Sequence, residues 1–376
     1  MGLWKGAAVL AVSALVGWQV ERSDARLYGR VLTVGGERLE GYLRWDRNET
    51  HWADFLDGRK EIPWENVWEA ERLDEEFRRQ RERGRRIRLP GLILSWEEDD
   101  RDDPLTADAG IRFGHLASIE VIDERRAVLV LKSGEEAELR GRSTDIGRAF
   151  RGLTVEDLER GEVELGWRDF RRVDFMSPPP GAARPSGERL HGSLRTRRGV
   201  ELTGFVAWDL DEALSTDLLD GEEGGRDRRI ELGSVATIEP QGRRGARVTL
   251  RSGEEMILTG SNDVNDDNRG IEISDPGLGR AVVSWAELES IVFHPPEGDG
   301  PSYEAFDGGS PLRGEVESRT GERLSGRIRW DNDEEHTWEV LDGTWEGVDY
   351  DIELRFVRHV EPVGTSAARV TLDDGR

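Results

Sequence analysis

The sequence contains no cysteine, which excludes several kinds of structure and chemistry. No disulfide can staple a domain, no thiolate can bind zinc or act as a nucleophile, and no lipid can be attached through a cysteine. Any function of this chain must therefore use other side chains.

Lysine is nearly absent too, because Lys5, Lys60 and Lys132 are the only lysines and arginine carries almost all the positive charge. Acidic residues outnumber basic ones by 78 to 53, so the formal net charge is −25. An acidic chain repels the phosphate backbone of nucleic acids. The sequence therefore predicts no nucleic-acid partner.

Recognisable catalytic motifs are missing. Of six scattered histidines, only His51 and His336 occupy matching positions of the repeat described below, and no G-x-S-x-G, H-E-x-x-H or P-loop motif occurs. Carboxylates are so abundant that a pair of them is no sign of a glycosidase. The sequence predicts a protein that is not an enzyme and has no cofactor, calcium being the one ion to consider.

Long apolar runs are limited to the N-terminus, where Lys5 precedes the stretch Gly6–Val20. About 20 residues are needed to span a bilayer, and these 15 fit the core of an export signal better. With Ser23 and Ala25 as small residues for cleavage, residues 1–25 are predicted to be a signal peptide. An uncleaved anchor and a buried helix remain alternatives. Export predicts a periplasmic, cell-envelope or extracellular protein with no membrane span after cleavage.

A pattern of four apolar residues at offsets 0, +2, +5 and +8 occurs five times. The five sets are Ile111/Phe113/Leu116/Ile119, Leu165/Trp167/Phe170/Val173, Ile230/Leu232/Val235/Ile238, Val283/Trp285/Leu288/Ile291 and Ile352/Leu354/Val357/Val360. A step of two fits a strand, and the steps of three fit one tight turn before another strand. Each set therefore predicts strand, one-turn 3₁₀ helix, strand.

A larger repeat contains these sets. Half-unit A runs from Gly29, Gly192 or Gly314 through a second glycine 12 residues later, then a Trp-Asp pair and a Leu-Asp-Gly turn, at equal spacings in three copies. Half-unit B follows and begins with L-x-S-G-E-E at Leu131 and Leu250. The predicted organisation is repeat 1 at 26–176 (half-unit B at about 125–176), a Pro/Gly linker at 177–188, repeat 2 at 189–294, a linker at 295–311, and a truncated repeat 3 at 312–376. Repeat 1 carries an insertion at about 59–110, predicted to hold a helix at 63–83 and a strand at 89–96.

The five apolar sets and the start of half-unit B resemble SH3-like and Sm-like small β-barrels, over about three quarters of the chain. The resemblance implies a mainly β protein of tandem small barrels, two half-units per repeat, with one helical insertion. The RNA-binding residues of Sm proteins are not recognisable here, and such barrels serve many unrelated functions. The chain is also similar to secreted bacterial proteins of unknown function. Whether half-units A and B form separate barrels or one fused sheet stays open.

The best candidate site is the W-D-x-[DN]-E box of half-unit A, together with the aspartate of the following Leu-Asp-Gly turn. The oxygen ligands that it offers are Asp46, Asn48 and Asp57 in copy 1, Asp209, Asp211 and Asp220 in copy 2, and Asp331, Asp333 and Asp342 in copy 3. Calcium takes six to eight oxygen ligands. The alternative is that the Trp fills the core while Asp and Asn shape a turn. The loop at 263–270 looks like a calcium loop but lacks its glycine and its last glutamate.

These features predict an exported, non-enzymatic repeat protein that acts as a binding or scaffolding module in the cell envelope, with proteins or envelope polymers as partners. One alternative is a calcium-stabilised surface protein. Another is a carbohydrate-binding protein that uses exposed tryptophans. The candidates for that role are Trp52, Trp64, Trp68, Trp338 and Trp345.

Overall fold

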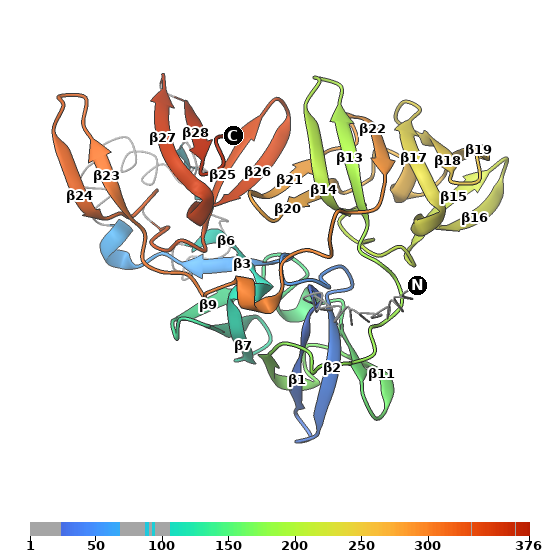
Figure 1. The fold of residues 1–376 in the computed structure, drawn as a ribbon, viewed down its shortest axis with the longest axis horizontal. Helices are drawn as coiled ribbons and strands as arrows, with labels where there is room; N and C mark the ends of the chain where they lie inside the picture. The colour runs from blue at the N-terminus through green and yellow to red at the C-terminus, as the bar shows by residue number, and fades with distance from the viewer. Residues whose placement is uncertain (1–23, 68–86, 90–91, 95–105, 332, 365) are drawn as a thin grey trace, which may run out of the picture.

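A computed structural model describes residues 24–67, 87–89, 92–94, 106–331, 333–364 and 366–376 (Figure 1). In this part the protein is mainly β, built of antiparallel sheets with very little helix. The predicted signal segment lies outside the described residues, apart from Asp24 and Ala25. Both of these pack on copy 1, where Asp24 accepts a hydrogen bond of 2.6 Å from the Tyr42 hydroxyl. No helix among the described residues is long and apolar enough to cross a membrane.

Copy 1 supplies twelve of the described strands. Its elements are β1 (Tyr28–Thr33), β2 (Arg38–Trp45), β3 (Phe55–Glu61), β4 (Ile87–Leu89), β5 (Leu92–Leu94), β6 (Thr106–Arg112), η1 (Phe113–His115), β7 (Leu116–Val121), β8 (Arg126–Leu131), β9 (Glu136–Arg140), η2 (Gly147–Ala149), β10 (Leu153–Asp157), β11 (Gly161–Leu165) and β12 (Phe170–Phe175). Of the predicted insertion helix, residues 64–67 are described and helical. Where one strand was predicted at 89–96, the described residues form the short pair β4–β5.

Copies 2 and 3 repeat these elements without the insertion. Copy 2 consists of β13 (His191–Thr196), β14 (Glu201–Ala207), β15 (Leu218–Glu223), β16 (Arg226–Glu231), η3 (Leu232–Ser234), β17 (Val235–Pro240), β18 (Gly245–Leu250), β19 (Glu255–Thr259), η4 (Asn262–Val264), β20 (Ile271–Asp275), β21 (Gly279–Val283) and β22 (Leu288–Phe293). After η5 (Tyr303–Ala305) in the linker, copy 3 consists of β23 (Arg313–Glu317), β24 (Arg323–Arg327), β25 (Val340–Trp345), β26 (Val348–Glu353), η6 (Leu354–Phe356), β27 (Val357–Val363) and β28 (Ala367–Leu372).

The two complete copies have the same sheet topology. In copy 1 the strand order is β11-β10-β2-β1-β12-β7-β8-β9-β3-β6, and in copy 2 it is β21-β20-β14-β13-β22-β17-β18-β19-β15-β16. Strands β26 and β25 of copy 3 extend the second sheet beyond β21, which gives it twelve described strands. Among the described strands both sheets are open, with no closed barrel.

Half-units A and B are interleaved within each copy. In copy 1 the sheet divides into two five-strand blocks that meet at β12 and β7. The first block combines β1 and β2 of half-unit A with β10, β11 and β12 of half-unit B, and the second combines β3, β6 and β7 of A with β8 and β9 of B. Half-units A and B therefore form one fused sheet system rather than separate barrels.

The apolar sets lie where the pattern predicts a turn between strands. In the second block η1 stands between β6 and β7, and its Phe113 is buried. In the first block a turn at 167–169 stands between β11 and β12, and Trp167 is 5% exposed. The half-unit A sets thus form 3₁₀ helices as predicted, whereas the half-unit B sets form a hydrogen-bonded turn.

The repeated glycines allow close approach of strands. Gly29 and Gly41 face each other in the β1–β2 pair. A Cβ on Gly41 would lie 1.9 Å from the Glu156 carbonyl oxygen of β10, and one on Gly29 would lie 2.6 Å from that of Asp174 in β12. The 12-residue glycine spacing thus marks a crossing that admits no side chain.

The three copies pack against each other through ion pairs. Figure 1 shows copies 2 and 3 side by side above copy 1. Arg44 of copy 1 donates to Asp217 of copy 2 at 2.9 and 3.0 Å. In the reverse direction, Arg189 of copy 2 donates to Asp54 of copy 1 at 2.9 Å. The second linker also packs on copy 1, since the Lys132 Nζ donates to linker carbonyls and Phe306 is 2% exposed.

Candidate functional site

The W-D-x-[DN]-E box forms a tight turn at the end of β2. Trp45 and Glu49 exchange backbone hydrogen bonds of 2.8 and 3.1 Å. Asp46 and Arg47 have φ values of 44° and 75°, a left-handed conformation that Asp tolerates better than most residues. The Trp45 indole is fully buried and donates to the Asp145 carbonyl at 3.0 Å. The box therefore fixes the loop before η2 against the turn.

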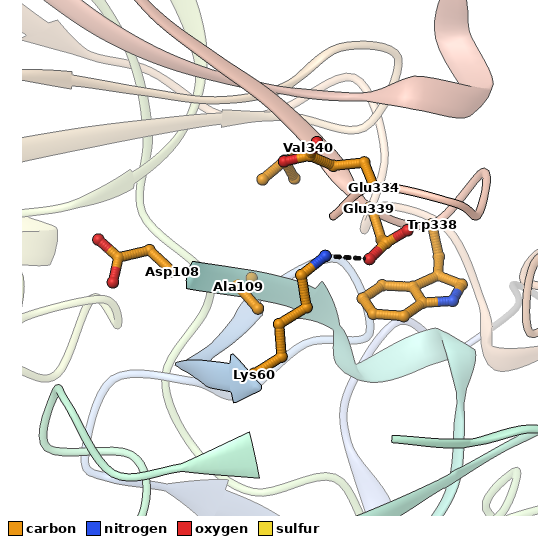
Figure 2. Close-up of a pocket in the computed structure, with 8 residues that line it drawn as sticks. Lys60, Asp108, Ala109, Glu334, Trp338, Glu339 and Val340 are labelled. Atoms are coloured by element: carbon orange, nitrogen blue, oxygen red, sulfur yellow. Dashed lines mark hydrogen bonds and ion pairs between the residues drawn. The ribbon is translucent and has the colours of Figure 1, made fainter. Parts of the chain in front are cut away.

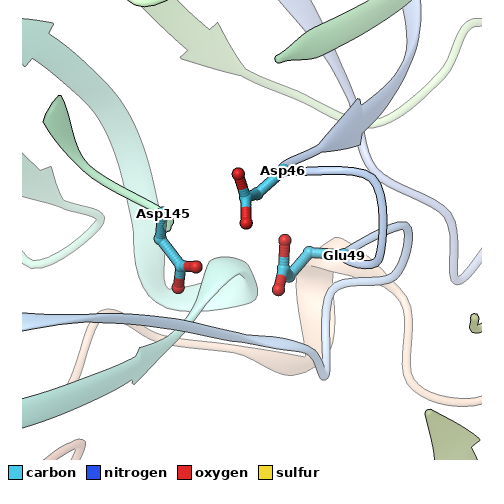
Figure 3. A group of neighbouring side chains, drawn as sticks. All are labelled: Asp46, Glu49 and Asp145. Carbon is cyan, nitrogen blue, oxygen red and sulfur yellow. The ribbon is translucent and has the colours of Figure 1, made fainter. Parts of the chain in front are cut away.

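This contact brings three carboxylates together. Ligand oxygens of Asp46, Glu49 and Asp145 lie within 4.8 Å of one another, and all three residues are buried. Figure 3 shows the three side chains converging from the turn and from the facing loop. Copy 2 holds the equivalent triad of Asp209, Glu212 and Asp263.

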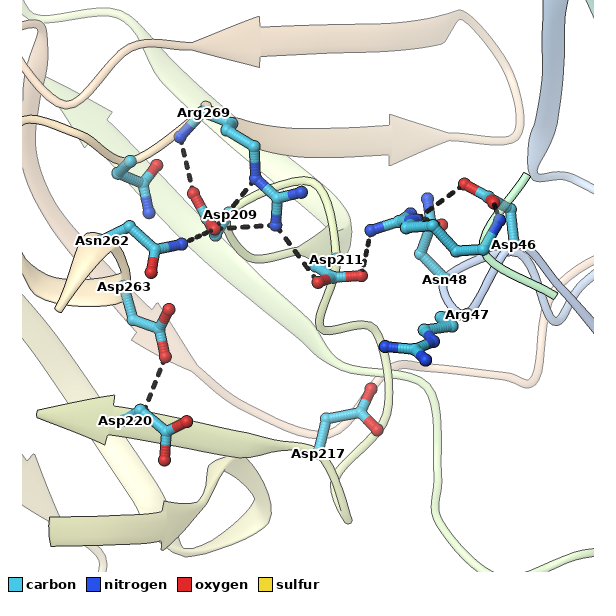
Figure 4. A network of polar contacts seen from close by, with 12 residues as sticks. Asp46, Arg47, Asn48, Asp209, Asp211, Asp217, Asp220, Asn262, Asp263 and Arg269 are labelled. Carbon is cyan, nitrogen blue, oxygen red and sulfur yellow. Dashed lines mark hydrogen bonds and ion pairs between the residues drawn. The ribbon is translucent and has the colours of Figure 1, made fainter. Parts of the chain in front are cut away.

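An arginine from half-unit B offsets part of this negative charge. The Arg151 backbone N–H and Nε donate to Asp46 at 2.6 and 2.9 Å. In copy 2 the backbone N–H and Nε of Arg269 donate to Asp209 at 2.6 and 3.0 Å (Figure 4). One guanidinium cannot neutralise three ionised carboxylates, so each triad still attracts a further positive charge.

Glu49 has one carboxylate oxygen with a partner, since Asn48 Nδ2 donates to Oε1, and one without. It is 5% exposed, and its Oε2 atom has no hydrogen-bond partner. Burial, together with the charges of Asp145 and Asp46, raises the pKa of Glu49 well above its ordinary value. Burial also raises the pKa of Asp145, with a further rise from Asp57. A buried carboxyl in this position must bind either a proton or a cation.

Glu212 repeats this arrangement in copy 2. Its Oε2 atom is also buried without a partner. Burial and the neighbouring Asp263 charge raise the pKa of Glu212 to about 9, and burial raises the pKa of Asp263 to about 6. Two triads with the same orphaned glutamate oxygen argue that the feature belongs to the repeat.

The structure brings only some of the sequence-predicted ligands into the triads. Asp46 and Asp209 belong to them, whereas Asn48 accepts a hydrogen bond of 2.7 Å from Arg151, and Asp211 contacts the same guanidinium. Asp57 and Asp220, the aspartates of the Leu-Asp-Gly turns, contact the triads only through their backbone. Asp57 and Asp220 donate backbone N–H groups to Asp145 and Asp263 at 2.6 and 2.7 Å, while their carboxylates pair with Arg280 and Arg229.

In the third copy, a lysine from copy 1 contacts acids of the box and of the segment that follows it. Lys60 Nζ lies 3.1 Å from the Asp333 carboxylate and donates to Glu339 (Figure 2). Burial and the Asp333 charge raise the pKa of Asp331 to about 7, and burial and Asp351 raise that of Asp342 to about 6. The hollow beside Lys60, with a volume of about 10 Å³, is at the lower limit of what one water molecule needs.

Sequence reasoning missed the other triad members. Glu49 and Glu212 are the last letter of the box, and Asp145 and Asp263 stand at matching positions of half-unit B, each seven residues before a glycine. The sequence therefore shows that these acids recur at the same position in each copy. It does not show that the box and the loop of half-unit B lie in contact. In the loop at 263–270, the Asp263 carboxylate is turned toward Asp220 rather than along its own loop.

The five irregular tryptophans do not share one environment. Trp52 is fully buried and lies 4.5 Å, between ring centroids, from Tyr303, and Trp338 is 4% exposed. Trp64 and Trp345 are 60% and 62% exposed. Trp68 lies outside the described residues.

A scan against protein-family models and searches of curated proteins and of solved structures found no match to this chain.

Proposed function

We propose that this chain is an exported, non-enzymatic repeat protein that serves as a scaffold or binding module in the cell envelope. The observation that carries the proposal is the way one residue joins three copies. Both Nη atoms of Arg280 in copy 2 donate to Asp57 of copy 1 at 2.7 Å, and its Nε donates to Asp351 of copy 3 at 2.7 Å. Repeats held in a fixed arrangement present extended surfaces to a partner.

The chemistry of the described polar groups supports a structural role. The aspartates of the boxes bind arginines and backbone N–H groups of the same fold, and other acidic side chains form ion pairs between copies. Partners of this scaffold are proteins or envelope polymers, since a net charge of −25 opposes nucleic acid.

The small-barrel resemblance extends this proposal to the fold. We infer that each five-strand block corresponds to one SH3-like or Sm-like unit, with its last strand placed by a one-turn helix or turn. The equal strand order of the two complete copies supports this interpretation. It makes each copy a pair of such units that exchange strands.

Fractionation and capture test the scaffold proposal. Full-length chain expressed with its N-terminus should be recovered outside the cytoplasm, and the chain from residue 24 should retain the same envelope component in repeated captures. The matched control is Arg280→Met, in which the copies are held less firmly. Recovery of the full-length chain in the cytoplasm would overturn the proposal. So would capture of the same envelope components by an unrelated acidic protein used as bait.

A second function, calcium-dependent stabilisation, is favoured by the orphaned glutamate oxygens. Glu49 belongs to a buried group of three carboxylates and has an unpartnered Oε2, and Glu212 of copy 2 has the same two properties. A divalent cation would neutralise the charge that Arg151 leaves uncompensated. A ligand that binds only the folded state raises stability by mass action.

Calorimetric unfolding of residues 24–376 tests this second function. Millimolar calcium should raise the melting temperature relative to EDTA, and the double variant Glu49→Gln/Glu212→Gln should lose that response. Because glutamine imitates a protonated glutamate, the variant should stabilise the calcium-free protein if a proton is the native occupant. Equal melting curves of the parent chain with calcium and with EDTA would remove calcium as a stabiliser.

A further inference from the structure

Strands β11 and β16 are two of the four described strands that end the large sheets, the others being β6 and β25. In the described part of the chain, β11 pairs only with β10, and β16 pairs only with β15. Most residues of both strands are exposed. An unpaired edge exposes a row of backbone donors and acceptors that can accept another strand.

The same chain already shows how such edges join. Strand β21 holds in copy 2 the place of β11 in copy 1, and β26 holds in copy 3 the place of β16 in copy 2. These two strands pair antiparallel, with Arg280 opposite Asp351 and Gly279 opposite Ile352. The Arg280–Asp351 pair is a salt bridge of 2.7 Å across this joint.

Transferring this register to the open edges brings opposite charges together. Gly161 corresponds to Gly279 and Ile230 to Ile352, so Glu162 of β11 would lie opposite Arg229 of β16. The charges are those of the Arg280–Asp351 pair exchanged between the two strands. Over the five paired positions β11 carries two glutamates, whereas β16 carries three arginines and one aspartate. The one like-charge pair, Glu164 opposite Asp227, is outweighed by these arginines.

The reversed signs also separate the two kinds of joint. A β11 edge laid on a β26 edge would put Glu162 opposite Asp351, and a β16 edge laid on β21 would put Arg229 opposite Arg280. Both wrong pairings bring like charges face to face, which disfavours them. The charges therefore favour β11 with β16, and β21 with β26, over these two exchanged pairings.

We propose that β11 of one molecule pairs with β16 of a second copy of this chain, in the register of the internal joint. Figure 1 shows β11 at the bottom of the molecule and β16 at its upper right, so the two edges of one molecule do not meet. Because the two surfaces differ, the contact is head-to-tail and builds a ring or an open chain. The inference rests on the proposed scaffold function and names its partner.

Sedimentation velocity of residues 24–376 at low ionic strength tests this pairing. The parent chain should associate with increasing concentration, and Glu162→Arg or Arg229→Glu should each weaken association at least about tenfold, since like charges then face each other. The double variant Glu162→Arg/Arg229→Glu should restore it. Glu159→Arg, an equal change of charge in the exposed turn beside β11, is the control and should leave association unchanged.

Each outcome decides the proposal. A parent that stays monomeric, or single reversals that associate like the parent, would mean that the charges only protect the edges from pairing. Loss in both single variants without recovery in the double variant would refute this register. Envelope capture by a monomeric parent would overturn the pairing alone and leave the scaffold function standing.

Discussion

Replacing Arg280 by methionine should lower the free energy of unfolding by about 2–4 kcal/mol. The guanidinium makes three hydrogen bonds of 2.7 Å, two to Asp57 and one to Asp351. Burial lowers the pKa of Arg280, but the charges of Asp57 and Asp351 outweigh it and leave that pKa raised. Methionine keeps most of the apolar stem but removes the charged guanidinium, whose Cζ lies 4.8 Å from the centre of the Phe55 ring.

The magnitude follows from burial of the partners. Breaking a fully buried ion pair costs about 3–5 kcal/mol, because the remaining charge is left without compensation. The Arg280 side chain is 14% exposed, but those of Asp57 and Asp351 are 33% and 27% exposed, so water solvates part of the charge left behind. This solvation reduces the expected cost below the upper limit.

A double-mutant cycle in equilibrium urea unfolding measures the coupling. Asp57→Asn combined with Arg280→Met should cost about 1–3 kcal/mol less than the sum of the two single changes. Arg195→Met, whose side chain is 57% exposed and 3.0 Å from Glu289, is the surface control and should cost less than about 1 kcal/mol. If Arg280→Met costs no more than Arg195→Met, Arg280 does not hold the copies together.

Two further predictions concern protons and glycine. Because the folded-state pKa of Glu212 is raised to about 9 from the ordinary 4.5, its contribution to stability is present below pH 4.5 and is lost as pH rises toward 9. The free energy of unfolding of the calcium-free protein should therefore fall over that window by at most about 1.4 kcal/mol per pH unit, the melting temperature should fall with it, and Glu212→Gln should flatten the slope. Gly41→Ala should destabilise the protein by about 3 kcal/mol or more in urea unfolding, because its Cβ would meet the Glu156 carbonyl at 1.9 Å, whereas Gly326→Ala at the same repeat position has open space and should be neutral. A flat pH profile for the parent contradicts the first, and equal losses for both glycines contradict the second.

The sequence predicted the repeated elements well because local patterns determine them. Alternation and the step of three place strands and tight turns within about ten residues, and packing then buries most of the same positions in copies 1 and 2. In copy 3, Val316 and Leu324 match the buried Val31 and Leu39 but are 51% and 62% exposed. The fused sheet was beyond this reasoning. Which strands pair depends on contacts between segments far apart in the chain, and either arrangement of half-units A and B buries the same apolar residues.

The candidate site shows the same limit. The box identified Asp46, but its partner Asp145 lies 99 residues later, beyond the insertion, and Asp263 lies 54 residues after Asp209. No spacing rule joins such positions. The arginines that meet the box were equally hidden, because arginine is so common in this sequence that no single one stands out.

One repeated acid shows how local structure and assembly are coupled. The ninth residue after each box tryptophan is Asp54, Asp217 or Glu339. Asp54 uses Oδ2 to accept the backbone N–H groups five and six positions after the tryptophan, at 2.8 and 2.9 Å. The same pair of N–H groups binds Asp217 in copy 2 and Glu339 in copy 3.

Each of these three carboxylates also binds a cation of a different copy. Asp54 accepts from Arg189, Asp217 from Arg44 and Glu339 from Lys60. Glu339, which is longer than the two aspartates, pairs with the one lysine among these three cations. The point charge of a lysine does not require the planar geometry of a guanidinium. A residue whose local task is to close a turn thus also sets where the next copy binds. Because closing the turn orients the carboxylate, folding of each copy prepares the surface on which the others assemble.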